Sequence, residues 1–319
     1  MMNKIDGGSR SGKPPMFYVM LVVVSFCAWI ASRSFLGKSP IAFLLGWASL
    51  FNWTEWLGAL VVAVGGWQWL MLYRIGYFPS ADEMLFSFDK LYGYPEFFLK
   101  RMFWSAPVIL TLAKAIYLLS VMPVVVVYLA LRDGALRRRL CTSFALIRLS
   151  GVVFYQFCPA AGPIYVFRQY PWIVPTLSPE VTLLPHLIMN ATPSIHLAMA
   201  VLVVFYSRYC SRLCHIFGWT CLVLTVLVTL GLGEHYVIDL VLGVPFAVAI
   251  DCVPYRSQRR KAYGCVLLVL AWEFALCHGL ALQLPASVAL LLSCMTVAAP
   301  FAPRFQISGA ELAAIAETE

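Results

Sequence analysis

The sequence predicts an all-α membrane protein, a polytopic bundle of about eight to ten transmembrane helices. The first observation is composition: 61% of the 319 residues are hydrophobic and 12% are charged, whereas soluble domains carry about a quarter charged residues. The second is that apolar stretches of about 20 residues, enough to span a bilayer, recur along the chain. These observations exclude a soluble globular protein, a disordered chain and a secreted disulfide scaffold.

The charge pattern predicts which helix ends face the cytoplasm. The formal net charge is +8, and basic residues gather in three short segments, 132–139, 208–212 and 256–261. Short basic loops mark the cytoplasmic side of a membrane protein, so we interpret this charge as topology and not as a nucleic-acid-binding surface. Alternation of the helices then places residues 158–193 and the 232–236 turn on the non-cytoplasmic side, facing periplasm, exterior or lumen.

The N-terminal part, residues 1–77, is predicted to form membrane helices. It holds an apolar run at 16–32, interpreted as a retained anchor. A second run at 41–73 fits either two short helices or one tilted helix.

Residues 78–104 differ, because charged residues interrupt the apolar ones. Ser80 and Glu83 match a capping box. Four apolar residues follow at helical spacing, namely Met84, Leu85, Phe88 and Leu91. This pattern predicts one amphipathic helix lying on the membrane surface.

The later apolar runs predict the membrane crossings. They cover roughly 105–131, 141–157, 194–210, 214–233, 236–253, 263–282 and 286–303. We divide this part into a core at 105–255, C-terminal membrane helices at 256–303 and a solvated tail at 304–319.

Residues 158–193 make an unusually long connection between membrane helices. Loops longer than about 12–15 residues are usually functional or disordered, and the seven prolines of this segment restrict its backbone. We therefore expect an ordered lid. Of the ten cysteines, Cys158 is the one in this non-cytoplasmic segment.

The stretch from Thr192 to His196 opens an apolar helix. Thr192 is suited to the N-cap and Pro193 to the first helical position. The backbone N–H groups of Ser194, Ile195 and His196 would then lack helical acceptors and form an anion site at the positive end of the helix dipole. His196 would lie beside a bound phosphate.

A second polar stretch runs from Gly233 to Asp239. His235 and Asp239 are four residues apart, so a helix would place them on one face. There the carboxylate can hold one imidazole N–H, select the tautomer and stabilise the imidazolium. An unpaired carboxylate inside the membrane edge is costly, and His235 is its nearest candidate partner. Tyr236 is predicted to anchor at the membrane interface.

The topology puts both stretches at the same membrane face. His196 begins an inward-running helix, and His235 lies where an outward-running helix turns back. Two imidazoles, a carboxylate and an anion site at a helix N-terminus make a phosphoryl-transfer centre. The three remaining histidines are predicted to have structural roles: His186, His215 and His278.

These motifs resemble the second and third signatures of the type 2 phosphatidate phosphatase superfamily. A third stretch and the His-Tyr-x-x-Asp form are similar to its inositol phosphorylceramide synthase branch. The resemblance covers roughly residues 105–255. The motifs are Pro193-Ser194-x-His196, His235-Tyr236-x-x-Asp239-x-x-x-Gly243 and Tyr155-x-x-Cys158-Pro159-Ala160-Ala161-Gly162-Pro163.

The resemblance implies a six-helix phosphatase-like core and a role for each polar residue. His235 would attack phosphorus and form a phosphohistidine, Asp239 would orient it, and His196 would protonate the leaving oxygen. The implied reaction uses neither metal nor other cofactor. The implied partners are a lipid phosphate or phospholipid donor and, for a transferase, a lipid hydroxyl acceptor.

The sequence departs from the family pattern at its phosphate-binding positions. The first signature, K-x6-R-P, is absent, and Thr229 stands where the arginine six residues before the nucleophile is expected. Cations must therefore come from elsewhere, and Arg148 and Arg168 are the candidates, because guanidinium groups bind phosphate oxygens bidentately. Ser194 is a further candidate phosphate contact.

Three functions remain open from the sequence. The first is a lipid phosphotransferase, and its alternative is a lipid phosphate phosphatase in which water attacks the phosphohistidine. The second is a haem-binding electron carrier with the two histidines as axial ligands. The third is a transporter, which predicts inverted repeats, and the sequence shows no repeat.

Overall fold

The structure is a computed structural model that describes residues 79–155, 157–167 and 191–301. Within these ranges it contains eleven α-helices, α5 to α15, and no strand, as an all-α protein requires. The predicted N-terminal helices at 1–77, the tail at 304–319 and most of the predicted lid lie outside the described residues.

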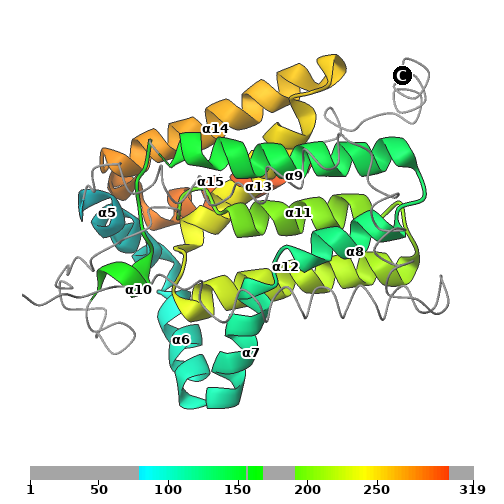
Figure 1. The fold of residues 1–319 in the computed structure, drawn as a ribbon. Coiled ribbons are helices and arrows are strands. Elements are labelled where there is room, and N and C mark those ends of the chain that lie inside the picture. Colours follow the sequence, from blue (N-terminus) through cyan, green and yellow to red (C-terminus); the bar gives the residue numbers. More distant parts are fainter. Residues whose placement is uncertain (1–78, 156, 168–190, 302–319) are drawn as a thin grey trace, which may run out of the picture. The chain divides into compact units, whose positions relative to one another are not determined.

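Helix α11 (Ile195–Ser207) is the centre of the bundle (Figure 1). It contacts α8 (Met122–Ala130), α9 (Gly134–Phe154), α12 (Arg212–Leu232) and α13 (Val237–Cys252). Its sequence carries apolar residues on every side, and a helix with that pattern is stable only when it is surrounded. Almost all of its side chains are buried accordingly.

Helix α12 is the one helix in the described part of the chain that is long and apolar enough to cross a membrane by itself. Helices α7 (Pro107–Leu118) and α8 pass the same test only as a pair. Large apolar side chains stand exposed along one face of α12, three or four residues apart. They are Leu213, Ile216, Trp219, Val223 and Leu227.

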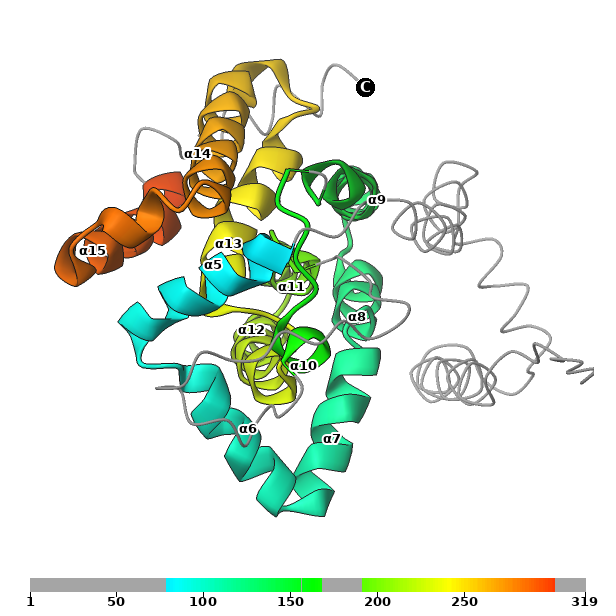
Figure 2. The same cartoon turned by 90° about the vertical axis from the view of Figure 1, so that its left-hand side faces the viewer.

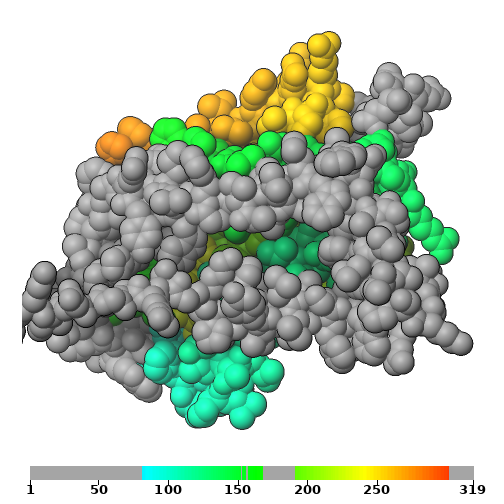
Figure 3. Space-filling model, viewed as in Figure 1, coloured from blue at the N-terminus to red at the C-terminus, as the bar shows by residue number. Residues whose placement is uncertain are grey.

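The predicted crossing at 105–131 is not one continuous helix. Helices α7 and α8 are bent by 56° at the break between Leu118 and Met122. Pro123, at the start of α8, has no N–H group to continue the helical hydrogen bonds of α7. Figure 3 shows the hairpin of α6 and α7 projecting at the lower edge of the view.

The predicted single helix at 78–104 is also wrong. Helix α5 (Pro79–Asp89) and the short 3₁₀ helix η1 (Lys90–Tyr92) end at Gly93, and α6 (Pro95–Ser105) begins after Tyr94. Both linking residues have positive φ angles, 76° and 53°, which no helix continues. Ser80 lies inside α5 and is not its N-cap.

Two of the three acidic residues of α5 do not lie on a polar outer face, whereas the third, Glu83, is exposed. Asp82 and Asp89 are fully buried, because α5 packs across α13 and α14 (Arg259–Cys277), as Figure 2 shows. The amphipathic interpretation assumed that charge points to water. Here both carboxylates accept hydrogen bonds from backbone N–H groups of the bundle instead.

The C-terminal part of the described chain adds two α-helices that both contact α13, and two short 3₁₀ helices. Helix α14 is followed by the 3₁₀ helix η3 (Ala281–Gln283), α15 (Ala286–Ala298) and the 3₁₀ helix η4 (Ala299–Phe301). Their order and positions agree with the apolar runs at 263–282 and 286–303.

The three basic segments lie at the opposite end of the bundle from the two polar stretches. Arg139 near the start of α9 forms a 2.6 Å ion pair with Asp251 near the end of α13. The hydroxyl of Tyr206, near the end of α11, also donates to Asp251 at 2.6 Å. Arg139 is therefore a half-buried partner of Asp251 and not a free loop charge, while His196 and His235 lie at the other ends of α11 and α13.

Candidate active site

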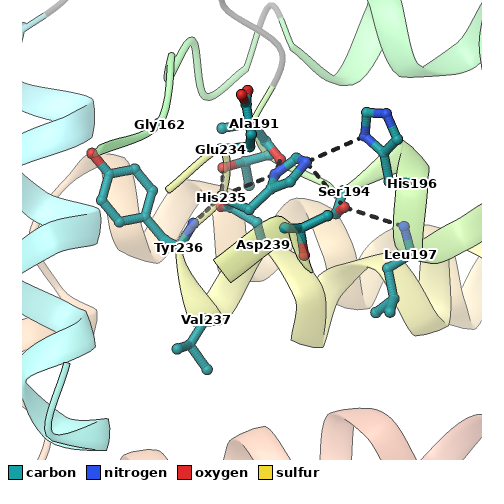
Figure 4. Close-up of polar contacts among 12 residues, drawn as sticks. Gly162, Ala191, Ser194, His196, Leu197, Glu234, His235, Tyr236, Val237 and Asp239 are labelled. Atoms are coloured by element: carbon teal, nitrogen blue, oxygen red, sulfur yellow. Dashed lines mark hydrogen bonds and ion pairs between the residues drawn. The ribbon is translucent and has the colours of Figure 1, made fainter. Parts of the chain in front are cut away.

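Two histidine rings meet at the N-terminal ends of α11 and α13 (Figure 4). Nε2 of His235 lies 3.5 Å from Nδ1 of His196, and the ring centroids are 5.7 Å apart. The rings come from positions 39 residues apart in the sequence. The predicted convergence of the two stretches is therefore present in the structure.

The surroundings of His235 select its tautomer. Nδ1 lies 2.9 Å from the carbonyl oxygen of Ala191. A carbonyl only accepts hydrogen bonds, so Nδ1 carries the hydrogen and Nε2 keeps its lone pair. That lone pair faces Ser194 Oγ at 3.3 Å as well as His196. His235 thus presents an unprotonated nitrogen to the space between the two helix ends.

Asp239 lies beside His235, but the helical face predicted for the pair does not exist. His235 precedes α13, which begins at Val237, and Asp239 occupies the third position of that helix. Its Oδ2 accepts from Tyr236 N–H at 2.8 Å and lies 3.5 Å from His235 Nδ1, while Oδ1 accepts from the hydroxyl of Thr192. The closest partners of the Asp239 carboxylate are therefore the Tyr236 N–H and the Thr192 hydroxyl. The carbonyl oxygen of Ala191 is closer to His235 Nδ1 than the carboxylate is.

Helix α11 begins later than predicted. Its N-cap is Ser194, not Thr192, and the Ser194 hydroxyl accepts from Leu197 N–H at 3.3 Å. The Ser194 N–H donates to the carbonyl oxygen of Asp239 at 3.0 Å, so it is not part of an anion site. Ile195 and His196 are the first two helical residues, and their N–H groups have no acceptor within the helix. The predicted anion site thus shrinks to these two groups.

A glutamate that sequence reasoning missed lies next to the histidines. Glu234 Oε2 accepts from the Tyr165 hydroxyl at 2.8 Å and from the Tyr117 hydroxyl at 3.5 Å. Tyr117 packs its ring on His196, with the centroids 4.4 Å apart. Burial raises the pKa of Glu234, and the nearby Lys100 partly opposes that rise. The acidic residue directly before His235 was the only signal in the sequence.

The buried Asp82 of α5 holds the segment from Cys158 to Gly162 in place, and this segment forms a wall of the site. Its carboxylate accepts from the N–H groups of Ala161 and Gly162 at 3.2 and 3.1 Å, and from the Tyr236 hydroxyl at 2.8 Å. Tyr236 is fully buried, so its predicted role as an interface anchor is wrong. Gly162 lies against the backbone of Glu234 with φ at 97°. Burial raises the pKa of Asp82 to about 6, although its hydrogen bonds oppose that rise.

The predicted phosphate-binding cations have different outcomes. The guanidinium of Arg148, in the second half of α9, interacts electrostatically with His196 and with Tyr155, so it lies near the histidine pair. Arg168 lies outside the described residues. Thr229 donates its hydroxyl to the carbonyl oxygen of Thr225 at 2.7 Å, within its own helix, and takes no part in the site.

The other two described histidines make contacts apart from the histidine pair, and their structural role stays a prediction. His215 contacts the Ser207 hydroxyl and the Trp219 indole N–H. His278 contacts the carbonyl oxygen of Phe274, one turn earlier in its own helix. His186 lies outside the described residues. Among the residues that the structure describes, no group of three His, Cys, Asp or Glu side chains is placed to hold a metal ion.

Comparison with known proteins places this site in a family. The family model of the PAP2 superfamily matches residues 84–253, which is more than half of the chain and includes both histidines, Asp239 and Glu234. No curated protein and no solved structure matches the chain. The members of the matched family are generally phosphatases or phosphotransferases acting on lipid-like substrates, and they are typically membrane-associated. The chain belongs to the PAP2 superfamily.

Proposed function

We propose that the protein is a membrane-embedded phosphotransferase that moves a phosphate-containing headgroup from a donor lipid to the hydroxyl of an acceptor lipid. The observation that carries this proposal is the state of His235. Its Nδ1 is held by Ala191, and its Nε2 lone pair is directed at the space shared with His196 and Ser194. A nitrogen so oriented can attack phosphorus.

In the first step, His235 attacks the donor. A bond forms between Nε2 and phosphorus while the bond from phosphorus to the leaving oxygen breaks. His196, in its protonated form, transfers a proton to that oxygen. The phosphorus takes the position beside Nε2 that the His196 ring now contacts at 3.5 Å, so substrate binding exchanges this contact for contacts of both rings with the phosphoryl group. The product is a phosphohistidine at His235.

In the second step, the acceptor hydroxyl attacks the phosphohistidine. The neutral His196 accepts the hydroxyl proton, the new oxygen–phosphorus bond forms and the nitrogen–phosphorus bond breaks. Asp239, 3.5 Å from Nδ1 of His235, stabilises the positive charge that the ring carries while Nε2 is bonded to phosphorus. The enzyme returns to its starting protonation state without a metal or cofactor.

Several groups can hold the phosphoryl oxygens. The N–H groups of Ile195 and His196 open α11, and a helix N-terminus of this kind stabilises a bound anion. The Ser194 hydroxyl is 3.3 Å from the attacking nitrogen. Arg148 supplies positive charge from α9, and we retain Arg168 as a candidate from the sequence. These contacts would take the place of the arginine that the family pattern expects at the position of Thr229.

The Glu234 cluster positions the acid–base histidine. Tyr117 covers one face of the His196 ring, and its hydroxyl is directed to Glu234. Tyr165 donates to the same carboxylate oxygen. This arrangement limits rotation of His196 away from the substrate.

We also propose that the chain is a multi-pass membrane protein with its site at the non-cytoplasmic end of the bundle. The exposed apolar face of α12, whose residues follow one another by three or four, is the surface that lipid chains cover. The basic segments near Arg139 lie at the end away from the histidines, and basic loops favour the cytoplasmic side.

The family assignment leaves hydrolysis as the competing outcome and sets aside the haem-carrier and transporter alternatives. The test uses purified protein in mixed micelles, a panel of headgroup-labelled phospholipids and lipid phosphates, and acceptor lipids carrying free hydroxyls: ceramide, diacylglycerol and a polyprenol-linked sugar. Mass spectrometry of the products separates headgroup exchange from release of free headgroup or phosphate. Products that never depend on the acceptor would refute transfer and leave a phosphatase.

The intermediate has its own experiment. Without acceptor, the labelled group should remain on the protein at His235 in an acid-labile, base-stable bond. The variant His235→Ala should lose both label and turnover, whereas His278→Ala, which removes an exposed histidine outside the site, should keep both. A fully active His235→Ala variant would exclude this mechanism.

A further inference from the structure

Two cysteines distant in the sequence meet beside the active site. Cys158 directly follows Phe157, and Cys277 at the end of α14 contacts the backbone at that point. The Cys277 thiol donates to the carbonyl oxygen of Phe157 at 3.5 Å, across 120 positions of sequence. Both side chains belong to one apolar cluster, and both are free thiols in the structure.

The pair lies where a covalent link would restrain the site. Cys158 opens the short segment that continues to Ala160, whose carbonyl oxygen accepts from Ala191 N–H at 3.0 Å, and to Gly162, which packs against Glu234. Ala191 in turn holds His235. Cys277 is the last residue of α14, so the two thiols connect the wall of the site to a helix that is otherwise remote in sequence.

We propose that Cys158 and Cys277 form a disulfide bond in the mature protein. Disulfides form and persist in oxidising compartments, and the sequence places Cys158 on the non-cytoplasmic side. The inference therefore rests on the proposed sidedness of the active site, but not on the phosphohistidine mechanism.

The oxidation is a thiol–disulfide exchange with a disulfide-bearing oxidant of that compartment. Cys277, the more accessible of the two, loses its proton, and its sulfur attacks one sulfur of the oxidant disulfide. This forms a mixed disulfide and releases the first thiolate of the oxidant. The deprotonated Cys158 sulfur then attacks the Cys277 sulfur and releases the second thiolate. Two protein thiols are oxidised, and one disulfide is reduced to two thiols.

The bond would hold the segment after α9 in place when substrate enters. A cross-link across this length of chain removes conformations from the unfolded state. It also prevents the wall that carries Gly162 from separating from α14. The expected consequence is higher thermal stability for the oxidised protein than for the reduced protein.

The test starts from full-length protein in native membranes. Free thiols are blocked with N-ethylmaleimide in denaturant without reductant, and the protein is digested with chymotrypsin. We expect one linked pair of peptides carrying Cys158 and Cys277, which separates only after reduction. The control Cys294→Ser removes an exposed cysteine of α15 and should leave the linked pair unchanged.

Single variants extend the test. In Cys158→Ser, the Cys277 thiol should become fully blocked by the reagent, and the converse should hold in Cys277→Ser. Reductant should lower the melting temperature of the wild-type protein and leave that of Cys158→Ser unchanged. Complete blocking of both thiols in wild-type membranes would overturn the proposal. Headgroup transfer measured on the same preparation shows separately whether the proposed function stands.

Discussion

The substitution Asp239→Asn tests how His235 is supported. It removes the negative charge and keeps the shape of the side chain. The amide oxygen can still accept from Tyr236 N–H, and the amide nitrogen can donate to the Thr192 hydroxyl in place of accepting from it. We therefore expect the variant to fold, with a stability loss of about 1–2 kcal/mol from weaker hydrogen bonds at the cap.

The rate effect follows from the distance between Asp239 and His235. At 3.5 Å between Oδ2 and Nδ1, a full unit charge on the ring nitrogen gains about 4–5 kcal/mol at an effective dielectric constant of ~20. Because the imidazolium shares its charge between two nitrogens, about 2–5 kcal/mol is the usable range. At ~1.4 kcal/mol for each factor of ten, the loss in rate is on the order of 30- to 3,000-fold.

The tautomer sets an upper limit to this loss. Triads in which the carboxylate alone selects the tautomer lose about 10⁴-fold in the corresponding variant. In this protein the Ala191 carbonyl oxygen holds Nδ1–H at 2.9 Å and continues to do so in Asp239→Asn. The variant should therefore retain more activity than His235→Ala.

The assay measures kcat and KM for headgroup transfer in mixed micelles at fixed lipid mole fraction. The loss should appear in kcat, because Asp239 does not contact the lipid. The matched control is Asp133→Asn at the exposed N-cap of α9, where asparagine caps as well as aspartate. Activity of Asp239→Asn within threefold of wild type, or as low as that of His235→Ala, would show this reasoning to be incorrect.

Three further predictions concern the surroundings of the site. The variant His196→Ala should slow transfer from a lipid with a poor leaving group far more than from a nitrophenyl ester, because nitrophenolate leaves without a proton. Equal losses in kcat/KM for the two donors would refute the general-acid role. Gly162→Ala should cost about 1–3 kcal/mol and lower the melting temperature, because its φ is 97° and the new Cβ would lie 2.3 Å from the Glu234 carbonyl oxygen. Gly264→Ala, in the open space along α14, is the control and should not destabilise. Burial raises the pKa of Asp82 from 3.8 to about 6, so the folded protein keeps a proton that the unfolded chain releases near pH 4. Stability from this group is present below pH 4 and is lost as pH rises to about 6; thermal unfolding across pH should show that slope in wild type and not in Asp82→Asn.

Much of the helical core was predictable from sequence because its signals are local. The start and end of α12 and α13 agree with the apolar runs to within a few residues, because each helix coincides with a continuous apolar stretch of sequence. The order of His196 and His235 along alternating helices was sufficient to predict that they meet. Both inferences depend on spacing along the chain, which the sequence contains directly.

Several of the errors share one cause, which is that a segment distant in sequence supplied or took a hydrogen bond. Asp82 and Asp89 read as a polar surface, yet they are buried because remote N–H groups neutralise their cost. Thr192 is a residue type that often caps helices, yet its hydroxyl donates to Asp239. Ser194 caps the helix instead. Local propensity gives no information about such partners.

The sequence by itself determined the helical class and the pair of histidines at one end of the bundle, because the lengths of apolar segments and the order of residues are properties of the linear chain. Only the tertiary structure decided which nitrogen of His235 is free, since the acceptor that selects the tautomer is a backbone carbonyl 44 positions away. It also decided that Glu234, Tyr117 and Asp82 belong to the site. Hydrogen bonds between distant segments are made by folding, and no pattern along the chain encodes them separately.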